Sequence, residues 1–231
     1  MTESGVDLHP CCLVLELRQY TLHPGGRDIL AELFARHFLD AHAALGMHVP
    51  GLFADLDDPD RLVWLRGFTD MRARRQALSD FYRTGEVWRE HAAAANATMI
   101  DSDDVLLLRP VYVGSGYPGP DDPLHTTPTA GELVIDIKPL TRLPDAAGAP
   151  EAVAREIVAA AEAEGAEVLV VALTHPEPND FPALPVRDEQ VAVWLLRYPT
   201  PEARDGVTRR LEIRTDDEQV RLRALPGSQI A

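Results

Sequence analysis

The chain has 231 residues, of which 45% are hydrophobic and 26% charged, a balance typical of a folded protein with room for two small domains. Its formal net charge of −15 disfavours nucleic-acid phosphates and anionic membrane surfaces as partners. The acidic start MTESGVDLHP lacks the features of a signal peptide and no apolar run is long enough to cross a bilayer, so we expect a cytoplasmic protein.

The first half predicts the order strand, helix, strand, strand, helix, strand. An alternating strand is expected over residues 12–22, followed by an amphipathic helix over about 27–45 that ends at Gly46. The segments HVPGLFADL and RLVWLRGF predict two strands joined by the turn DDPD. Helical segments are expected at about 71–82 and 87–99, and DVLLLRPVY closes this half as a fourth strand.

The second half predicts the same order after a linker. Residues 113–131 are rich in Pro, Gly and Thr, which is typical of a linker between an N-terminal unit, 1–112, and a C-terminal unit, 132–231. The predicted elements are strand GELVIDIKPL, helix PEAVAREIVAAAEAEG, strands EVLVVALTH and EQVAVWLLRYP, a shorter helix in TPEARDGVTRRLEI, and strand QVRLRAL. We interpret the two halves as copies of one βαββαβ unit.

Corresponding residues support the duplication. Laid over each other, the halves place Trp64 on Trp194, Phe68 on Tyr198, Arg74 on Arg204, Glu16 on Asp136 and Arg18 on Lys138. A βαββαβ unit is ferredoxin-like, with both helices on one face of an antiparallel sheet, so its other sheet face needs a cover. We therefore predict an α+β fold in which the two tandem ferredoxin-like sheets face each other and form an α+β barrel.

The strand alternation places polar side chains on the face away from the helices. We expect Leu13, Leu15 and Leu17 to pack on the helices. The opposite face, which becomes the barrel interior, would carry Glu16, Arg18, Tyr20, Trp64, Arg66, Asp136, Lys138, Trp194 and Tyr198. Three basic groups against two acidic ones leave one positive charge, which suits a small anionic or aromatic ligand.

A purely structural interpretation of these residues stays open. Glu16 with Arg66, and Asp136 with Lys138, could be internal ion pairs that fix strand pairing, because buried charges are rarely left unpaired. Tyr20 and the tryptophans would then only fill the core.

Helix histidines are further candidates. His37 and His42 are five residues apart, about 140° around a helix, so they cannot bind one metal from one face. His91 lies one turn from Trp88, and the pair could line a pocket between helix and sheet or simply form a helix contact. Motifs for nucleotide binding, metal binding or a serine nucleophile are absent, so we expect no metal and no other cofactor.

The first half resembles the NIPSNAP family through ELRQYTLHPG, RLVWLRGFTDMRARRQAL, VWREH and LLLRP, over about residues 13–111. The second half is similar to a diverged copy, with Leu140 at the place of Tyr20 and no counterpart of VWREH. The resemblance implies the dimeric α+β barrel superfamily, which includes cofactor-free monooxygenases, isomerases, cyclases and haem-binding enzymes. Bacterial relatives often accompany natural-product pathways, and an arginine-rich chain whose only lysine is Lys138 is typical of a bacterial protein.

Together these features predict a cofactor-independent enzyme that acts on a small aromatic, polyketide-like or carboxylate metabolite in bacterial secondary metabolism. Arg18 or Arg66 would hold a carboxylate or enolate, and Glu16, Tyr20 or His91 would move a proton. The substrate-binding residues would be Trp64, Arg66, Trp88, Asp136, Lys138, Trp194 and Tyr198.

Two other functions are open alternatives. The first is a non-catalytic small-molecule binding or scaffold protein, and the second, ranked last, is a haem protein of the same superfamily. We expect either a monomer with an internal pseudo-dimer or a homodimer.

Overall fold

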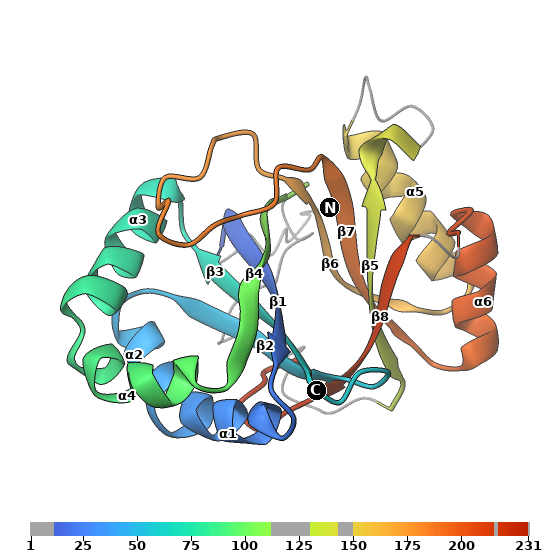
Figure 1. Cartoon of the computed structure of the whole chain (residues 1–231). Coiled ribbons are helices and arrows are strands. Elements are labelled where there is room, and N and C mark those ends of the chain that lie inside the picture. The colour runs from blue at the N-terminus through green and yellow to red at the C-terminus, as the bar shows by residue number, and fades with distance from the viewer. Residues whose placement is uncertain (1–11, 112–129, 143–149, 215–216, 231) are drawn as a thin grey trace, which may run out of the picture.

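Eight antiparallel strands close into one barrel in the computed structural model, which describes residues 12–111, 130–142, 150–214 and 217–230 (Figure 1). The first half consists of β1 (Val14–Leu22), α1 (Gly26–Leu33), η1 (Phe34–Phe38), α2 (Leu39–Ala44), β2 (His48–Asp55), β3 (Arg61–Phe68), α3 (Met71–Ser79), η2 (Asp80–Thr84), α4 (Glu86–Asn96) and β4 (Met99–Pro110). The second half consists of β5 (Glu132–Pro139), η4 (Leu140–Arg142), α5 (Pro150–Ala163), β6 (Glu167–Thr174), β7 (Val191–Tyr198), α6 (Pro201–Arg210) and β8 (Glu218–Ala224). The predicted α+β barrel of two βαββαβ units is confirmed, while the expected linker, 113–131, lies almost entirely outside the described residues.

The barrel closes where the two halves meet. The strand order is β1-β3-β2-β8-β5-β7-β6-β4, so each half contributes four adjacent strands. The fourth strand of each half pairs with the second strand of the other, as in Phe53 opposite Ala224 and Leu108 opposite Thr174. The helices lie outside, with α1 to α4 over one side of the barrel and α5 and α6 over the other (Figure 1).

Local signals set the helix ends much as expected. Gly46 and Gly165 follow helices with φ of 75° and 69°, a left-handed conformation that glycine adopts without strain. Helix α3 begins after Asp70, whose carboxylate accepts the Ala73 amide at 2.7 Å, and Thr200 caps α6 in the same way. The helix expected over 27–45 forms, but its middle turn, η1, is a π-helix.

The barrel interior is apolar, so the predicted orientation of the strands is wrong. Leu15 and Leu17 lie in a buried cluster that draws on both halves and on no helix, with Leu65, Ile135 and Val193 among its members. Tyr20 and Trp64 instead share a cluster with residues of the surrounding helices. The alternation of β1 was therefore recognised correctly, but its two faces were exchanged.

Packing explains this exchange. The space between two facing sheets is filled by interdigitating side chains, and branched aliphatic residues fill it without polar atoms that need partners. Charged groups are tolerated on the helix side, because helices and loops can bring partners to them. Both faces of β1 are buried, so alternation alone does not show which face turns inward.

Strand register also corrects the alignment of the two copies. Trp64 in β3 pairs with Arg18, and its counterpart Trp194 in β7 pairs with Asp136. Arg18 therefore corresponds to Asp136, and Tyr20 two residues on corresponds to Lys138. The predicted pairing of Glu16 with Asp136 and of Arg18 with Lys138 is wrong by two residues, a slip that preserves the strand face.

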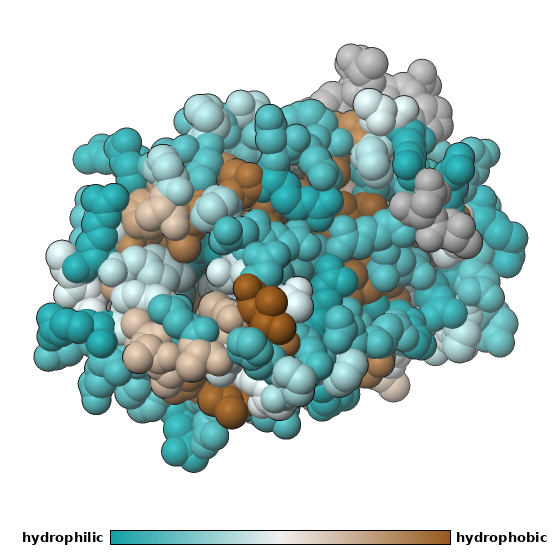
Figure 2. All heavy atoms as spheres, in the orientation of Figure 1, coloured by the Kyte–Doolittle hydropathy of each residue, from teal (hydrophilic) through white to brown (hydrophobic). Residues whose placement is uncertain are grey.

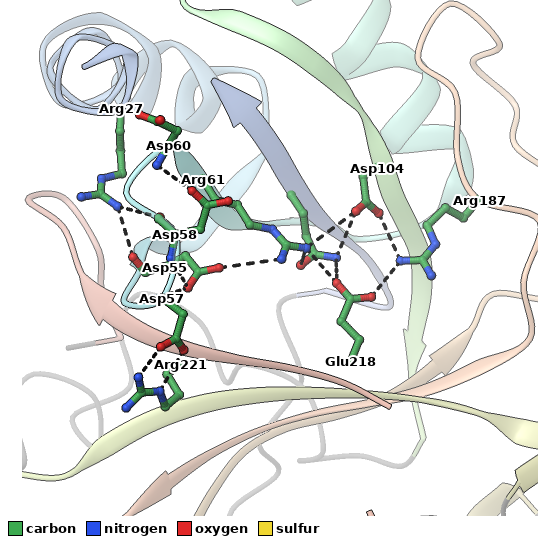
Figure 3. Close-up of polar contacts among 11 residues, drawn as sticks. Arg27, Asp55, Asp57, Asp58, Asp60, Arg61, Asp104, Arg187, Glu218 and Arg221 are labelled. Atoms are coloured by element: carbon green, nitrogen blue, oxygen red, sulfur yellow. Dashed lines mark hydrogen bonds and ion pairs between the residues drawn. The ribbon is translucent and has the colours of Figure 1, made fainter. Parts of the chain in front are cut away.

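One end of the barrel holds the polar groups that its centre lacks (Figure 3). Arg61 lies between acidic residues, with Nη2 2.8 Å from Glu218 and Nη1 3.7 Å from Asp55. Arg187 bridges Asp104 and Glu218 at 3.2 Å each. This network joins strands of both halves at the mouth, where water can reach charged groups.

The side shown in Figure 2 is mainly hydrophilic with small separate hydrophobic areas. Within the described part of the chain, the helices are too short or too polar to cross a bilayer.

Candidate functional site

A pocket of about 310 Å³ lies between the sheet and the helices of the first half. This volume is at the lower end of the range for small-molecule sites. The pocket is lined by Arg18, Tyr20, Leu30, Phe34, Phe38, His42, Trp64, Phe81, Tyr82, Arg83, Trp88, Asn96, Met99, Ser102, Phe181, Ala183 and Leu184. The lining is mostly aromatic and aliphatic, with polar groups gathered on β1 and on nearby helices.

Two π-helical turns supply much of this wall. Phe34 and Phe38 lie in η1, and Phe81, Tyr82 and Arg83 lie in η2. A π-turn inserts one residue into a helix and rotates the following residues, and such turns are frequent at functional sites. Here both turns direct aromatic side chains toward the same cavity.

A loop from the second half completes the pocket. Residues 175–190 join β6 to β7 and reach across to α3 of the first half (Figure 1). The loop places Phe181, Ala183 and Leu184 in the pocket wall. It is attached to the first half through Asp180, whose Oδ1 accepts Arg74 Nη1 at 2.5 Å. The site is therefore built by both repeats.

Behind the pocket, one buried carboxylate binds three guanidinium groups. Glu16 Oε2 accepts Arg18 Nη1 at 2.8 Å and Arg66 Nη2 at 2.6 Å, while Oε1 accepts Arg74 Nε at 2.7 Å. Glu16, Arg66 and Arg74 are fully buried, and Arg18 retains 1% exposure. Burial would raise the pKa of Glu16, but Arg66, Arg18 and Arg74 outweigh it and hold that pKa well below its usual range.

This arrangement fixes the polar end of the pocket. With Asp180 included, three arginines face two carboxylates, so one positive charge is left over. Arg66 also stacks over Trp64, with its guanidinium carbon 5.1 Å from the ring centroid. Arg18 is held from both sides by Glu16 and by the Tyr20 hydroxyl, which accepts Arg18 Nε at 2.8 Å.

His42 is a buried neutral imidazole in the same wall. Its Nδ1 lies 2.6 Å from the Phe38 carbonyl oxygen, which can only accept, so Nδ1 carries the proton and Nε2 a free lone pair. Nε2 has no hydrogen-bond partner among the described residues. Burial, with a smaller contribution from Arg66, lowers the pKa of His42 to about 3. The ring therefore acts as a hydrogen-bond acceptor and stays uncharged at neutral pH.

The structure brings together only some of the predicted site residues. Arg18, Tyr20, Trp64 and Trp88 line the pocket, and Glu16 and Arg66 lie directly behind it. His91 does not line this pocket: it stacks on His37, with ring centroids 3.9 Å apart.

The remaining candidates lie in the second half, far from this pocket in the fold. Trp194 and Tyr198 are buried against α5 and α6. Lys138 Nζ donates to the Leu211 and Glu212 carbonyls at 2.8 and 3.1 Å, and so caps the end of α6. Asp136 accepts Gln219 Nε2 at 2.6 Å, and burial raises its pKa to about 7.

Sequence reasoning assigned no role in the site to four residues that shape it. His42 and Tyr82 follow from the π-turns, which regular helical spacing does not reveal. Phe181 comes from a loop of the other repeat. Arg74 lies in an arginine-rich helix whose composition is typical of a solvent-exposed helix. The only sequence signal for a buried partner was the excess of polar residues on one face of β1.

Comparison with known proteins gives a family for the half of the chain that carries most of this pocket. The model of the NIPSNAP family matches residues 15–113. The first half is a NIPSNAP domain. Arg18, Tyr20, Trp64 and Trp88 lie within the NIPSNAP domain, whereas Phe181 lies outside it. No curated protein matches the chain.

Solved structures are similar to the whole chain, and two of them share its fold at a TM-score above 0.5. A proposed monooxygenase from Lactobacillus acidophilus is 12% identical, with 91% of this chain and 93% of that chain covered and a TM-score of 0.55. A proposed monooxygenase from Fusobacterium nucleatum is 11% identical, with 92% of each chain covered and the same TM-score of 0.55. An anthrone oxidase-like protein is 11% identical over 98% of each chain, at a TM-score of 0.48. At these identities the likeness to the two proposed monooxygenases shows the fold alone.

Proposed function

We propose that the chain is an enzyme that acts on a small aromatic or carboxylate metabolite by acid–base chemistry in the pocket of its NIPSNAP domain. The observation that carries the proposal is the meeting of an aromatic cavity of about 310 Å³ with a fixed, positively charged polar end. The sequence predicted a reaction site inside the barrel. We now propose that the site lies between the sheet and the helices.

The residues have distinct roles in this proposal. Arg18 holds a substrate oxygen and balances negative charge that develops on it. Tyr20 donates a proton, since burial raises the pKa of its hydroxyl and keeps it protonated at neutral pH. Glu16 positions Arg18 rather than accepting a proton, because both of its oxygens are occupied by guanidinium groups.

The aromatic wall would hold the substrate ring and exclude water. Phe81 lies 4.4 Å from His42 and Phe34 lies 4.8 Å from Trp64, measured between ring centroids, so the wall is closely packed. Exclusion of water strengthens the electrostatic effect of Arg18 on a bound oxygen. A bacterial natural-product intermediate would suit such a site.

A haem does not fit these residues. The histidine in the pocket wall, His42, is packed against Phe81, and its Nε2 is buried. A tetrapyrrole ring would also need more room than about 310 Å³ between closely packed aromatic side chains. Among the described residues, no group of three metal-binding side chains is present either.

A panel of aromatic ketones and hydroxyaromatic acids tests the proposed function. Each compound is incubated with the protein in heavy water, and mass spectrometry detects product or incorporated deuterium. We expect turnover by the natural protein and a loss of at least about a hundredfold in Tyr20→Phe, with ligand binding retained. Tyr198→Phe, at a buried tyrosine outside the pocket, is the matched control.

The second candidate function is non-catalytic binding, and it is favoured by the same closely packed pocket. Binding of panel members without any turnover would support it and would contradict the enzyme. Equal turnover by the natural protein and by Tyr20→Phe would remove the role assigned to that tyrosine.

A further inference from the structure

The polar end of the pocket offers hydrogen-bond donors and hardly any acceptors. Arg18 donates one hydrogen bond from Nε to Tyr20 and another from Nη1 to Glu16. Its third nitrogen, Nη2, has no partner among the described residues. The Tyr20 hydroxyl accepts from Arg18, and the Tyr82 hydroxyl accepts from Arg66 Nη1 at 3.2 Å. Within the described residues neither hydroxyl proton has an acceptor. We call Arg18, Tyr20 and Tyr82 the donor cluster.

The three members of the donor cluster lie close together. Arg18 and Tyr20 are hydrogen-bonded, and Arg66, which binds Tyr82, shares Glu16 Oε2 with Arg18. The hydroxyl of Tyr82 also acts electrostatically on both other members and favours the raised pKa of Tyr20. One small group bound at this end of the pocket would therefore meet more than one of these donors.

Acceptors that could compete with the ligand are occupied, buried or remote. No carboxylate lines the described part of the pocket, because Glu16 lies behind Arg18 and is bound by three guanidinium groups. His42 Nε2 is a neutral acceptor, and it is buried within the wall. Asn96 is exposed and Ser102 half-buried, so both lie toward the opening.

Shape restricts the remainder of the ligand. Phe34, Phe38, Trp88 and Phe181 give flat apolar surfaces in a volume of about 310 Å³. Such walls accept a planar body of two or three fused rings, and they offer an ammonium group no anionic partner. The donors and the surplus positive charge thus act on the single polar edge of a flat molecule.

We propose that this pocket selects planar aromatic compounds in their ionised form, with a phenolate, enolate or carboxylate oxygen held by the donor cluster. A phenol bound here should lose its proton at lower pH than it does in water. Because the proposal presumes a ligand in this pocket, it rests on the function proposed above, and it adds the charge state of the ligand and a role for Tyr82.

Umbelliferone, a bicyclic phenol whose absorption differs between its neutral and ionised forms, tests the proposal. Its spectrum is titrated with pH, free and bound to the whole protein, and its binding is compared with that of its methyl ether. We expect the phenolate to bind at least about tenfold more tightly than the phenol, which lowers the pKa of the bound probe by about one unit. Naphthoate should displace the probe, and the relative affinities show whether a carboxylate or a phenolate is preferred.

Variants test whether the donor cluster causes the preference for phenolate. Tyr82→Phe and Tyr20→Phe each remove one donor without removing a charge, and each should reduce the preference for phenolate at least about threefold. Arg18→Gln should abolish it, and the two tyrosine variants still test the proposal if the arginine variant does not fold. Tyr198→Phe should leave the preference unchanged.

The outcomes separate the two proposals. If the methyl ether and the phenol bind as tightly as the phenolate, the pocket takes ligands but the selection of ionised forms is wrong. An unchanged or raised pKa of the bound probe would also show that the selection of ionised forms is wrong. If neither probe, methyl ether nor naphthoate binds, the pocket is not a ligand site and the proposed function fails as well.

Discussion

At the scale of single residues, Glu16 determines the polar end of the pocket. It is fully buried and binds Arg18, Arg66 and Arg74, so it provides the negative charge that lets three guanidinium groups leave water together. Arg18 in turn reaches the cavity with one nitrogen, Nη2, that has no partner in the part of the chain that the structure describes. The geometry of a candidate ligand site thus depends on a residue that does not line it.

Replacement of Glu16 should therefore be costly. We expect Glu16→Gln to lower the free energy of unfolding by about 3 to 5 kcal/mol, because it leaves buried guanidinium groups without their counter-charge. Urea unfolding measures the change. Glu32, paired with Arg36 at 2.6 Å on the surface, gives the control Glu32→Gln, which should change stability by less than about 0.5 kcal/mol. Equal effects of the two substitutions would contradict the role of Glu16.

Asp136 should make stability depend on pH in the opposite sense to most carboxylates. Burial raises its pKa from 3.8 to about 7 in the folded protein, so folding favours its protonated form. Its contribution to stability is complete below pH 3.8 and is lost as the pH rises through about 7, by roughly 4 kcal/mol at most.

Asp136→Asn removes this titration. Relative to the variant, the natural protein should lose stability between about pH 4 and about pH 7, as measured by urea unfolding at each pH. Other titrating groups contribute to both proteins and cancel in the difference. A constant difference across this range would show that Asp136 titrates as it does in the unfolded chain.

At the scale of elements, the loop over residues 175–190 decides how the pocket is enclosed. Its ends are attached by backbone hydrogen bonds of 2.8 Å from His175 to Leu107 and from Arg187 to Val105. Between these points, the described contacts to the first half are made by side chains, chiefly the Asp180–Arg74 ion pair and Phe181 beneath Arg83. Asp180 is thus the main polar attachment of the loop tip.

Asp180→Asn should loosen the loop without unfolding the domain. Amide hydrogen exchange over residues 176–186 should become several-fold faster, because an ion pair is replaced by a neutral hydrogen bond. Global stability should fall by only about 1 to 2 kcal/mol, since Arg74 keeps its bond to Glu16. Asp188→Asn, at an exposed residue of the same loop, is the control. Equal exchange rates in the two variants would contradict the attachment.

At the scale of the whole molecule, the two repeats cover each other's sheets. The interior cluster combines Leu15, Leu17 and Leu65 of the first repeat with Ile135 and Val193 of the second. Burial of such side chains stabilises a fold by about 1.5 to 3 kcal/mol each. Neither repeat can bury this face alone.

Separation of the repeats tests this dependence. Residues 12–111 and 130–230, produced as separate chains, should each self-associate, because each exposes an apolar sheet face. Mixing them should give a one-to-one complex with the mass of the intact protein, as measured by light scattering. Two stable monomers would show that the barrel interface is dispensable for folding.

Local sequence patterns predict part of this architecture. The strand RLVWLRGF, the helix ends at Gly46 and Gly165, and the paired tryptophans Trp64 and Trp194 were sufficient to predict the elements, the duplication and the barrel. These features depend on interactions between near neighbours and on a regular period, which a single sequence records directly.

Only the tertiary structure decided which face of β1 turns inward. Glu16, Arg18 and Tyr20 occur on one face in either case. Glu16 binds Arg66 and Arg74, and these two arginines bind Tyr82 and Asp180, all of which come from other elements. The π-turns that bring His42 and Tyr82 to the pocket break the helical period, and the loop with Phe181 comes from the other repeat. Sequence alone determined the elements and the pattern of each face, because these are local. The closed barrel determined where the site lies, because buried charges are stable only where groups from distant parts of the sequence pair with them.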